Sequence, residues 1–421
     1  MVFPMRKNSD IKVVMLISNN LEIDARVRKE AQAVSDAGFN LTVVGIGKNI
    51  PEDLVDADYK LVLIESMYKG KTLCPRLGQE DIWYPVRVLV NLTVTRYRQR
   101  QFGKIYRENA RFPDIVAKPE MVSVALVANP DIIHCHDLDT LWAGYNVAKS
   151  TGAKLIYDSH EIYLELRFLD PILRSQFAEV ESEVFPKIDA FITVSPAIGR
   201  VLTQKYQSDI EPVVVYNGGT HIVDTASLVA RLPKLFFQGY FATDRNNIQL
   251  IKAMDKLRGK ATLTLQGWGQ DEDAYKRLIK EMKLEETVCL IPPCGPLDVV
   301  ASASHYDVGI INSIGIDENF KNTLPNKLFD YMCAGLAIAS TDLPPIKEII
   351  DENGCGMTYE QKGVNHTAEV LLGLVSEPDR IFNMKKASLK AAEKFVWPRQ
   401  AEKLTALYNS LACKIEENNA N

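Results

Sequence analysis

Residues 322–335 (NTLPNKLFDYMCAG) contain the side chains that most directly suggest chemistry. Pro325 suits the first turn of a helix, Thr323 can cap that helix, and Gly335 can end it. Lys327 then lies in the first turn, where a cation opposes the helix dipole unless an anion is bound nearby. A helix N-terminus with free amides and a lysine is suited to a diphosphate. The alternative is that Lys327 simply faces solvent.

The elements around this helix predict an α/β protein. Short β-branched runs that read as buried strands alternate with helical segments, which predicts parallel sheets with right-handed crossovers. We expect strands at 12–18, 41–45, 61–64, 132–134, 154–158, 190–194 and 213–216, and again at 234–238, 262–266, 288–291, 308–311 and 336–340. The alternation pauses at 217–219, so a domain boundary is expected near 218–232. Ligands should bind at the carboxyl ends of the strands.

The composition is that of a globular protein long enough for two cores. The chain has 421 residues, of which 46% are hydrophobic and 24% charged, and its net charge of −5 argues against nucleic-acid binding. Its 7 cysteines are scattered without a C-x-x-C pair, which favours reduced thiols and a cytoplasmic location. Neither a signal peptide nor an apolar run of membrane-spanning length is expected.

Residues 83–107 depart from this acidic background. They carry basic and aromatic side chains and no acid, which is typical of a segment that lies on an anionic membrane surface. A packed helix with a solvated basic edge, or a homodimer contact, explains the pattern equally well. The first interpretation would place the protein peripherally at the inner face of the cell membrane.

Several motifs together resemble a known enzyme family. These are DARVRKEA (24–31), HCHD (134–137), YDSHE (157–161), VSP (194–196), YNG (216–218), GWG (267–269), the helix around Lys327 and FVWPRQ (395–400). In this order and spacing they resemble the GT-B glycosyltransferases, most closely the retaining family 4. The resemblance extends from about residue 12 to residue 411.

The resemblance implies two doubly wound Rossmann-like domains facing across a cleft. An acceptor-binding domain would span 1–222, with 83–107 as a basic insertion, and a nucleotide-sugar-binding domain 223–394. Residues 395–421 would form a helix that crosses back to the first domain, followed by a disordered tail. The implied reaction moves a sugar from a UDP- or GDP-linked donor to a glycan, lipid-linked or small-molecule acceptor, with retention and without metal or cofactor, as in bacterial polysaccharide synthesis.

The implied donor site departs from the family pattern at two places. The family has two glutamates eight positions apart, where this chain has Asn322 and Asp330. Asp330 can still bind a ribose diol, whereas Asn322 carries no charge. The family also has an arginine after the glycine that follows the first strand of this domain, where Tyr240 stands, while Arg245 occupies the position of the family's lysine. The implied donor contacts are Gly239, Tyr240, Arg245, Gly267, Asn322, Thr323, Leu324, Pro325, Asn326, Lys327 and Asp330.

The catalytic groups implied by the resemblance are Arg245, Lys327 and His136. The two cations and the amides of 324–326 would stabilise charge on the departing diphosphate, and His136 would contact the donor sugar unless it is a structural histidine. The implied acceptor contacts are Asn19, Asn20, Asp24, Arg26 and His160. Alternatively, Arg26 and Lys29 form weak helix-surface ion pairs with Asp24 and Glu30.

No metal site is expected, because Asp137 and Asp139 form the only D-x-D spacing near the implied cleft. Two other function classes stay open. The first is an inactive nucleotide-sugar-binding protein that acts with a partner, which the uncharged Asn322 suggests. The second is a nucleotide-sugar 2-epimerase, which would need acid–base carboxylates that the sequence does not place.

Overall fold

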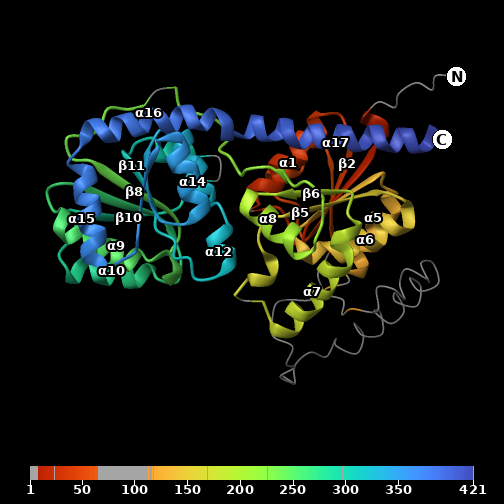
Figure 1. The fold of residues 1–421 in the computed structure, drawn as a ribbon, viewed down its shortest axis with the longest axis horizontal. Helices are drawn as coiled ribbons and strands as arrows, with labels where there is room; N and C mark the ends of the chain where they lie inside the picture. The colour runs from red at the N-terminus through yellow and green to blue at the C-terminus, as the bar shows by residue number, and fades with distance from the viewer. Residues whose placement is uncertain are drawn as a thin grey trace. The chain divides into compact units, whose positions relative to one another are not determined.

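The computed structural model describes residues 8–22, 24–64, 112, 116, 118–167, 169–224, 226–295 and 298–420. The segment 83–107 therefore lies outside the described residues. The chain divides into two compact units (Figure 1): unit 1 comprises 1–192, 203–213 and 404–421, and unit 2 comprises 193–202 and 214–403.

The first sheet has seven strands in the order β3-β2-β1-β4-β5-β6-β7, and the pairs β2–β3, β1–β2, β1–β4 and β4–β5 are parallel. The strands are β1 (Lys12–Leu16), β2 (Asn40–Ile46), β3 (Lys60–Ile64), β4 (Ile132–His136), β5 (Lys154–Ser159), β6 (Ala190–Thr193) and β7 (Val213–Val214). The helices between them are α1 (Ala25–Asp36), α5 (Pro119–Ala128), α6 (Leu138–Thr151), α7 (Pro171–Val184) and α8 (Pro196–Lys205).

Strand β4 places histidine side chains on one face of the first sheet and a cysteine side chain on the other. Because side chains alternate along a strand, His134 and His136 share one face and Cys135 takes the other. Cys135 packs on α6 so closely that a Cβ at Gly144 would lie 2.0 Å from its sulfur. Asp158 of β5 pairs in register with His136 and therefore lies on the histidine face.

The second sheet has six strands in the order β10-β9-β8-β11-β12-β13, with parallel pairs throughout. They are β8 (Lys234–Tyr240), β9 (Thr262–Trp268), β10 (Val288–Ile291), β11 (Val308–Ile311), β12 (Ala337–Thr341) and β13 (Gly356–Tyr359). The helices are α9 (Asn247–Ala253), α10 (Glu272–Glu281), α11 (Val299–Ala303), α12 (Glu318–Asn322), α13 (Asn326–Cys333), α14 (Pro344–Asn353), α15 (Val364–Val375) and α16 (Pro378–Phe395).

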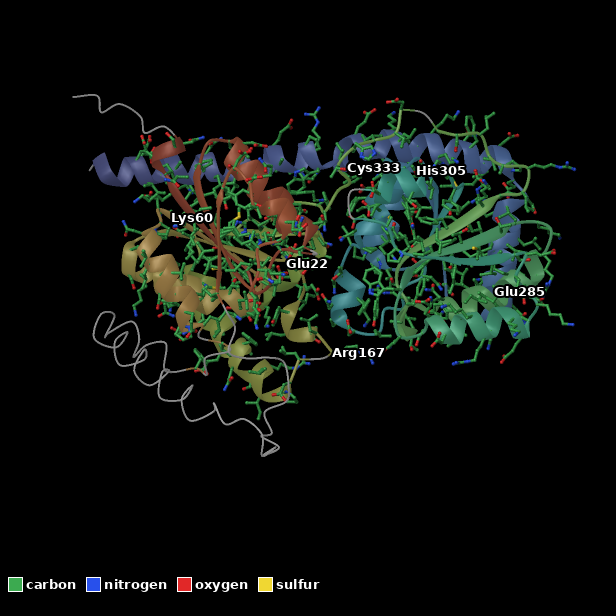
Figure 2. The ribbon with its side chains drawn as sticks, turned by 180° about the vertical axis from the view of Figure 1, so that it is seen from behind. Glu22, Lys60, Arg167, Glu285, His305 and Cys333 are labelled. Atoms are coloured by element: carbon green, nitrogen blue, oxygen red, sulfur yellow. The ribbon has the colours of Figure 1, made fainter. Side chains whose placement is uncertain are left out.

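Two apolar layers cover this second sheet. One contains residues of α9, α10 and α15, and the other contains residues of α13, α14 and the end of α16. Figure 1 shows α9, α10 and α15 together on one side of the strands, and Cys333 of α13 lies close to the α16 ribbon (Figure 2). The buried strands thus lose water on both faces, which explains their continuous apolar sequences.

Both Rossmann-like sheets that the sequence predicts are confirmed, and each expected strand is present. Strand β13 was missed, because GMTY is short and begins with a glycine. The capping prediction for Thr323 is wrong: this residue ends α12, and its hydroxyl donates to the carbonyl of Asn319 at 2.8 Å. Helix α13 begins at Asn326 with Pro325 as its N-cap residue, and Gly335 follows its end with a φ of +67°.

Helix α17 (Trp397–Ala420) closes the chain. Its residues up to 403 belong to unit 2 and those from 404 onward to unit 1, so one continuous helix has residues in both units. No helix among the described residues is long and apolar enough to cross a membrane.

Candidate functional site

The strand order of the second sheet creates a crevice at one position. The order in which successive strands are added to the sheet reverses between β8 and β11. Strands β9 and β10 lie on one side of β8, and strands β11 to β13 lie on the other side. In such sheets the crevice outside the carboxyl ends of these two strands is where ligands bind. The predicted donor residues Gly239, Tyr240, Arg245 and Lys327 all lie on β8 or on segments that follow β8 and β11.

Tyr331 fixes α13 at this crevice. Its hydroxyl accepts the backbone N–H of Gln238, near the end of β8, at 3.0 Å. Its ring lies across β11 at Gly309, where a Cβ would come within 2.2 Å of the ring. Burial raises the pKa of Tyr331 far above its ordinary value, so the hydroxyl keeps its proton. One side chain therefore joins the helix to both strands that border the crevice.

Lys327 lies in the first turn of α13 and approaches β8. Its Nζ is 4.0 Å from the centroid of the Phe237 ring, a cation–π contact, and 3.2 Å from where a Cβ of Gly239 would be. Any side chain at position 239 would therefore crowd the ammonium group. Lys327 is thus held at the carboxyl end of β8, not in open solvent.

Gly267 permits close contact between the ends of β8 and β9. The two glycines Gly239 and Gly267 are paired in register, and a Cβ at position 267 would lie 2.0 Å from the carbonyl oxygen of Gly239. Beyond them the rings of Tyr240 and Trp268 meet edge to face at 6.0 Å. These rings are 45% and 55% exposed, so an aromatic pair occupies the surface where the family resemblance implies an arginine.

Arg245 ends the short 3-10 helix η5 (Thr243–Arg245) that follows β8. Its Nη1 donates to the hydroxyl of Ser313 at 3.3 Å, and its guanidinium lies 5.2 Å from the centre of the Phe320 ring. Ser313 follows β11, so this guanidinium lies on the β11 side of the crevice. A guanidinium can bind phosphate oxygens through two parallel hydrogen bonds.

The remaining predicted donor residues lie before and along α13. The Asn322 side chain turns back onto its own helix and donates to the carbonyl of Glu318 at 2.7 Å. Leu324 is buried, and Pro325 has no N–H, so the predicted set of amides at 324–326 loses one member. Asp330 is half-buried, one turn beyond Lys327.

The predicted acceptor residues of unit 1 fall into two groups. Asn19, Asn20 and Asp24 precede α1 and are partly exposed, and Asp24 Oδ2 accepts from Asn19 Nδ2 at 2.9 Å. Arg26 is only 4% exposed. Its Nη2 lies 2.8 Å from Glu30 Oε1 and 3.1 Å from Asp158 Oδ2. Arg26 thus pairs with Glu30, one of the partners in the alternative prediction, but the expected surface location is wrong, because the pair is buried beside Asp158.

These contacts belong to a larger buried polar network beneath α1, which comprises Arg26, Glu30, His134, His136, Asp158 and His160. Residues 26 and 30 lie one helical turn apart and so face the same strands. The imidazoles of His134 and His136 stack at 4.1 Å, and His136 is 2% exposed. His134 Nδ1 lies 2.7 Å from the hydroxyl of Tyr408 on α17.

Burial and charge fix the protonation of this network. Burial, reinforced by His136, lowers the pKa of His134 to about 3, so this imidazole is neutral at pH 7. Burial also disfavours charge on His160, but Asp137 and Asp158 outweigh it and raise its pKa well above the ordinary value. Burial alone would raise the pKa of Asp158, but the charge of Arg26 outweighs burial and holds the pKa of Asp158 well below its usual range. Burial raises the pKa of Glu30.

Two known families match this chain, one in its first half and one in its second half. Residues 72–219 match Glycosyltransferase Family 4, and residues 227–394 match Glycosyl transferases group 1. Together the two matches cover about three quarters of the chain and meet near residues 219–227, at the junction between the two predicted domains. The chain is a GT-B glycosyltransferase. No curated protein matches its sequence.

Solved structures with this glycosyltransferase fold cover nearly the whole chain. A glycosyltransferase from Rickettsia africae is 14% identical with a TM-score of 0.68, covering 95% of this chain and 98% of its own. Sucrose-phosphate synthase from Thermosynechococcus elongatus is 15% identical with a TM-score of 0.67, and the match covers 96% of this chain and 100% of the synthase. Anabaena HepE in complex with UDP is 13% identical with a TM-score of 0.69, covering 95% and 100%.

Sequence reasoning missed several residues that contact the predicted site residues or the helix that carries Lys327. Ser313 and Tyr331 in unit 2 and Glu30, His134 and Asp158 in unit 1 were not among the predicted site residues. The alternation in HCH at 134–136 was an available signal, because it places two histidines on one face of a strand. The two aspartates of the D-x-D spacing have different partners: Asp137 lies 3.2 Å from His160, and Asp139 lies 3.7 Å from Lys118.

Proposed function

We propose that Arg245 and Lys327 bind the diphosphate of a nucleotide-sugar donor and stabilise the charge that develops as the sugar leaves. The observation that carries this proposal is the position of the two cations at the ends of β8 and β11. Preorganised cations aimed at developing charge are commonly the largest catalytic contribution. Because side chains supply this charge, we propose that the donor diphosphate needs no metal ion.

The donor is proposed to be UDP-linked, with a GDP-linked sugar as the alternative. Several proteins of similar fold are described in complex with UDP, among them HepE with UDP-glucose. Asp330 would accept hydrogen bonds from the ribose hydroxyls. Retention of the anomeric configuration is proposed on the strength of the Family 4 match.

The acceptor is proposed to bind unit 1 through the partly exposed Asn19, Asn20 and Asp24, with His160 beside them. Its class would be a glycan, a lipid-linked sugar or a small molecule. The expected contact of His136 with the donor sugar does not fit its burial, because both of its ring nitrogens are enclosed, and the alternative of a structural histidine is therefore proposed instead. Arg26 would act indirectly, by holding Asp158, which in turn contacts His160 at 3.2 Å.

A binding experiment tests the diphosphate assignment. We would measure UDP and uridine affinity by calorimetry for wild type, Lys327→Ala and Arg245→Ala, with Lys321→Ala as control. Lys321 is exposed and pairs with Glu318 on α12, so its loss removes a nearby charge outside the crevice. UDP affinity should fall at least tenfold in both site variants, while uridine affinity and the control stay unchanged. Equal losses for UDP and uridine would contradict the assignment.

A turnover experiment separates transfer from simple binding. The protein is incubated with radiolabelled UDP- and GDP-sugars, and slow release of free sugar is followed, with NMR of the first-formed anomer. Release with the donor's configuration supports a retaining transferase. Binding without release would instead favour the inactive protein that Asn322 suggests, and a nucleotide-linked sugar of altered stereochemistry would indicate an epimerase.

A further inference from the structure

The buried network of unit 1 contains polar atoms whose bonding is incomplete. Oε2 of Glu30, Nε2 of His134 and both ring nitrogens of His136 are buried without a hydrogen-bond partner, and Glu30 Oε1 has its ion pair with Arg26 at 2.8 Å. Burying a polar group without a partner is costly, so an interior cluster of such atoms calls for an explanation. These side chains are at most 2% exposed, so bulk water does not satisfy them.

The spacing of these atoms is that of a coordination shell. Asp158 Oδ2 lies 3.6 Å from both His134 Nε2 and His136 Nδ1, and Glu30 Oε2 lies 3.9 Å from His136 Nδ1. One ligand atom from each of the four residues fits within 4.8 Å of all the others. A tetrahedral ion about 2.0–2.2 Å from its ligands holds the ligand atoms about 3.3–3.6 Å apart. A small contraction of the cluster would reach that spacing.

The geometry points to a structural divalent-cation site in unit 1, in which His134 Nε2, His136 Nδ1, Glu30 Oε2 and Asp158 Oδ2 bind one transition-metal ion. Two imidazoles and two carboxylates favour Zn²⁺ over Mg²⁺ or Ca²⁺, which prefer shells of oxygen alone. The ion would lie under α1 and join it to β4 and β5. It has no part in binding the donor diphosphate in unit 2.

The contacts around the four ligands suit this role. A metal-bound imidazole usually donates its other N–H to a neighbour, and His134 Nδ1 has the Tyr408 hydroxyl at 2.7 Å for this purpose. Arg26 Nη2 contacts the other oxygen of Glu30, Oε1, at 2.8 Å, and it reaches both oxygens of Asp158, Oδ1 at 3.3 Å and Oδ2 at 3.1 Å. Glu30 can thus keep its arginine while it presents its second oxygen to the ion. Asp158 would exchange the Oδ2 contacts with Arg26 and His160 for the ion and keep Arg26 through Oδ1.

Metal content is the direct test. Full-length protein, purified without a polyhistidine tag, is equilibrated with Zn²⁺, dialysed against metal-free buffer and analysed by mass spectrometry. We expect about one ion per chain in wild type and in His305→Gln, and a loss of at least tenfold in His134→Gln. His305 is exposed and lies in unit 2 (Figure 2), so it controls for loss of any histidine. Metal-free wild type, or full retention in His134→Gln, would overturn the site.

A second measurement avoids the risk that His134→Gln fails to fold. Co²⁺ is added to wild-type protein stripped of metal, and the visible spectrum and thermal midpoint are recorded. Intense tetrahedral d–d bands at one equivalent, with a higher midpoint that a chelator reverses, are expected. Weak octahedral bands or an unchanged midpoint would show that the cluster holds only protons and water. Neither measurement depends on donor binding, so each outcome is independent of the proposed transfer reaction.

Discussion

The Tyr331 hydroxyl accepts the backbone N–H of Gln238 at 3.0 Å and so ties α13 to the end of β8. Tyr331→Phe leaves that part-buried N–H without its partner. We expect the unfolding free energy to fall by about 1–3 kcal/mol. We also expect UDP affinity to fall severalfold, because Lys327 lies on the loosened helix. Denaturant unfolding and calorimetry measure the two effects.

A matched control for Tyr331→Phe is Tyr240→Phe. It removes the same hydroxyl from a ring that is 45% exposed, so its unfolding free energy should stay within about 0.5 kcal/mol of wild type. Equal stability of the two variants would mean that the Gln238 contact contributes nothing to holding α13.

Gly267→Ala tests the close approach of β8 and β9. A methyl group at position 267 would lie 2.0 Å from the carbonyl oxygen of Gly239. This oxygen belongs to the backbone, which cannot move aside as the end of a flexible side chain can. We expect a loss of several kcal/mol in stability, measured by thermal unfolding. In Gly373→Ala nothing lies within 4 Å of the new methyl, and helix propensity predicts a gain of up to about 1 kcal/mol. A Gly267→Ala variant as stable as wild type would refute this close packing.

Asp330→Asn tests the ribose contact. A carboxylate that accepts from a hydroxyl contributes about 1.5–3 kcal/mol, so UDP affinity should fall roughly tenfold or more. The affinity for 2′,3′-dideoxy-UDP, which lacks both hydroxyls, should be the same in variant and wild type. If the substitution weakens both ligands equally, Asp330 acts through helix α13 and not through the ribose.

Lys385→Met tests the buried ion pair of unit 2. Lys385 Nζ lies 2.8 Å from Ser227 Oγ, 3.0 Å from the Tyr306 carbonyl and 3.1 Å from Asp307 Oδ1. Removing one partner of a buried pair leaves an uncompensated charge, which costs about 3–5 kcal/mol in unfolding free energy. The neighbouring Lys386 is exposed, so Lys386→Met serves as the control and should change little. Similar losses in both variants would show that Lys385 contributes only as a surface charge.

Local sequence was sufficient for the architecture and for the helix that carries Lys327. Continuous apolar runs such as KVVML at 12–16 favour strands buried on both faces, and their alternation with helices leads to parallel sheets. The position of Lys327 in the first turn of α13 follows from Pro325 and Gly335, which act on their immediate neighbours. The family motifs then gave the chemistry of the crevice.

Tertiary structure alone decided which side chains are buried together. Arg26 and Asp158 are separated by 132 positions yet share two hydrogen bonds, and Arg26, expected at the acceptor surface, lies inside the unit. Likewise, Arg245 meets Ser313, which is 68 positions away. Such partners depend on how strands and helices pack across the sheet, and local periodicity contains no information on that packing. The sequence by itself thus determined the elements and the donor helix, while the fold decided that His134 and His136 of β4 and His160 after β5 belong to one network around Asp158.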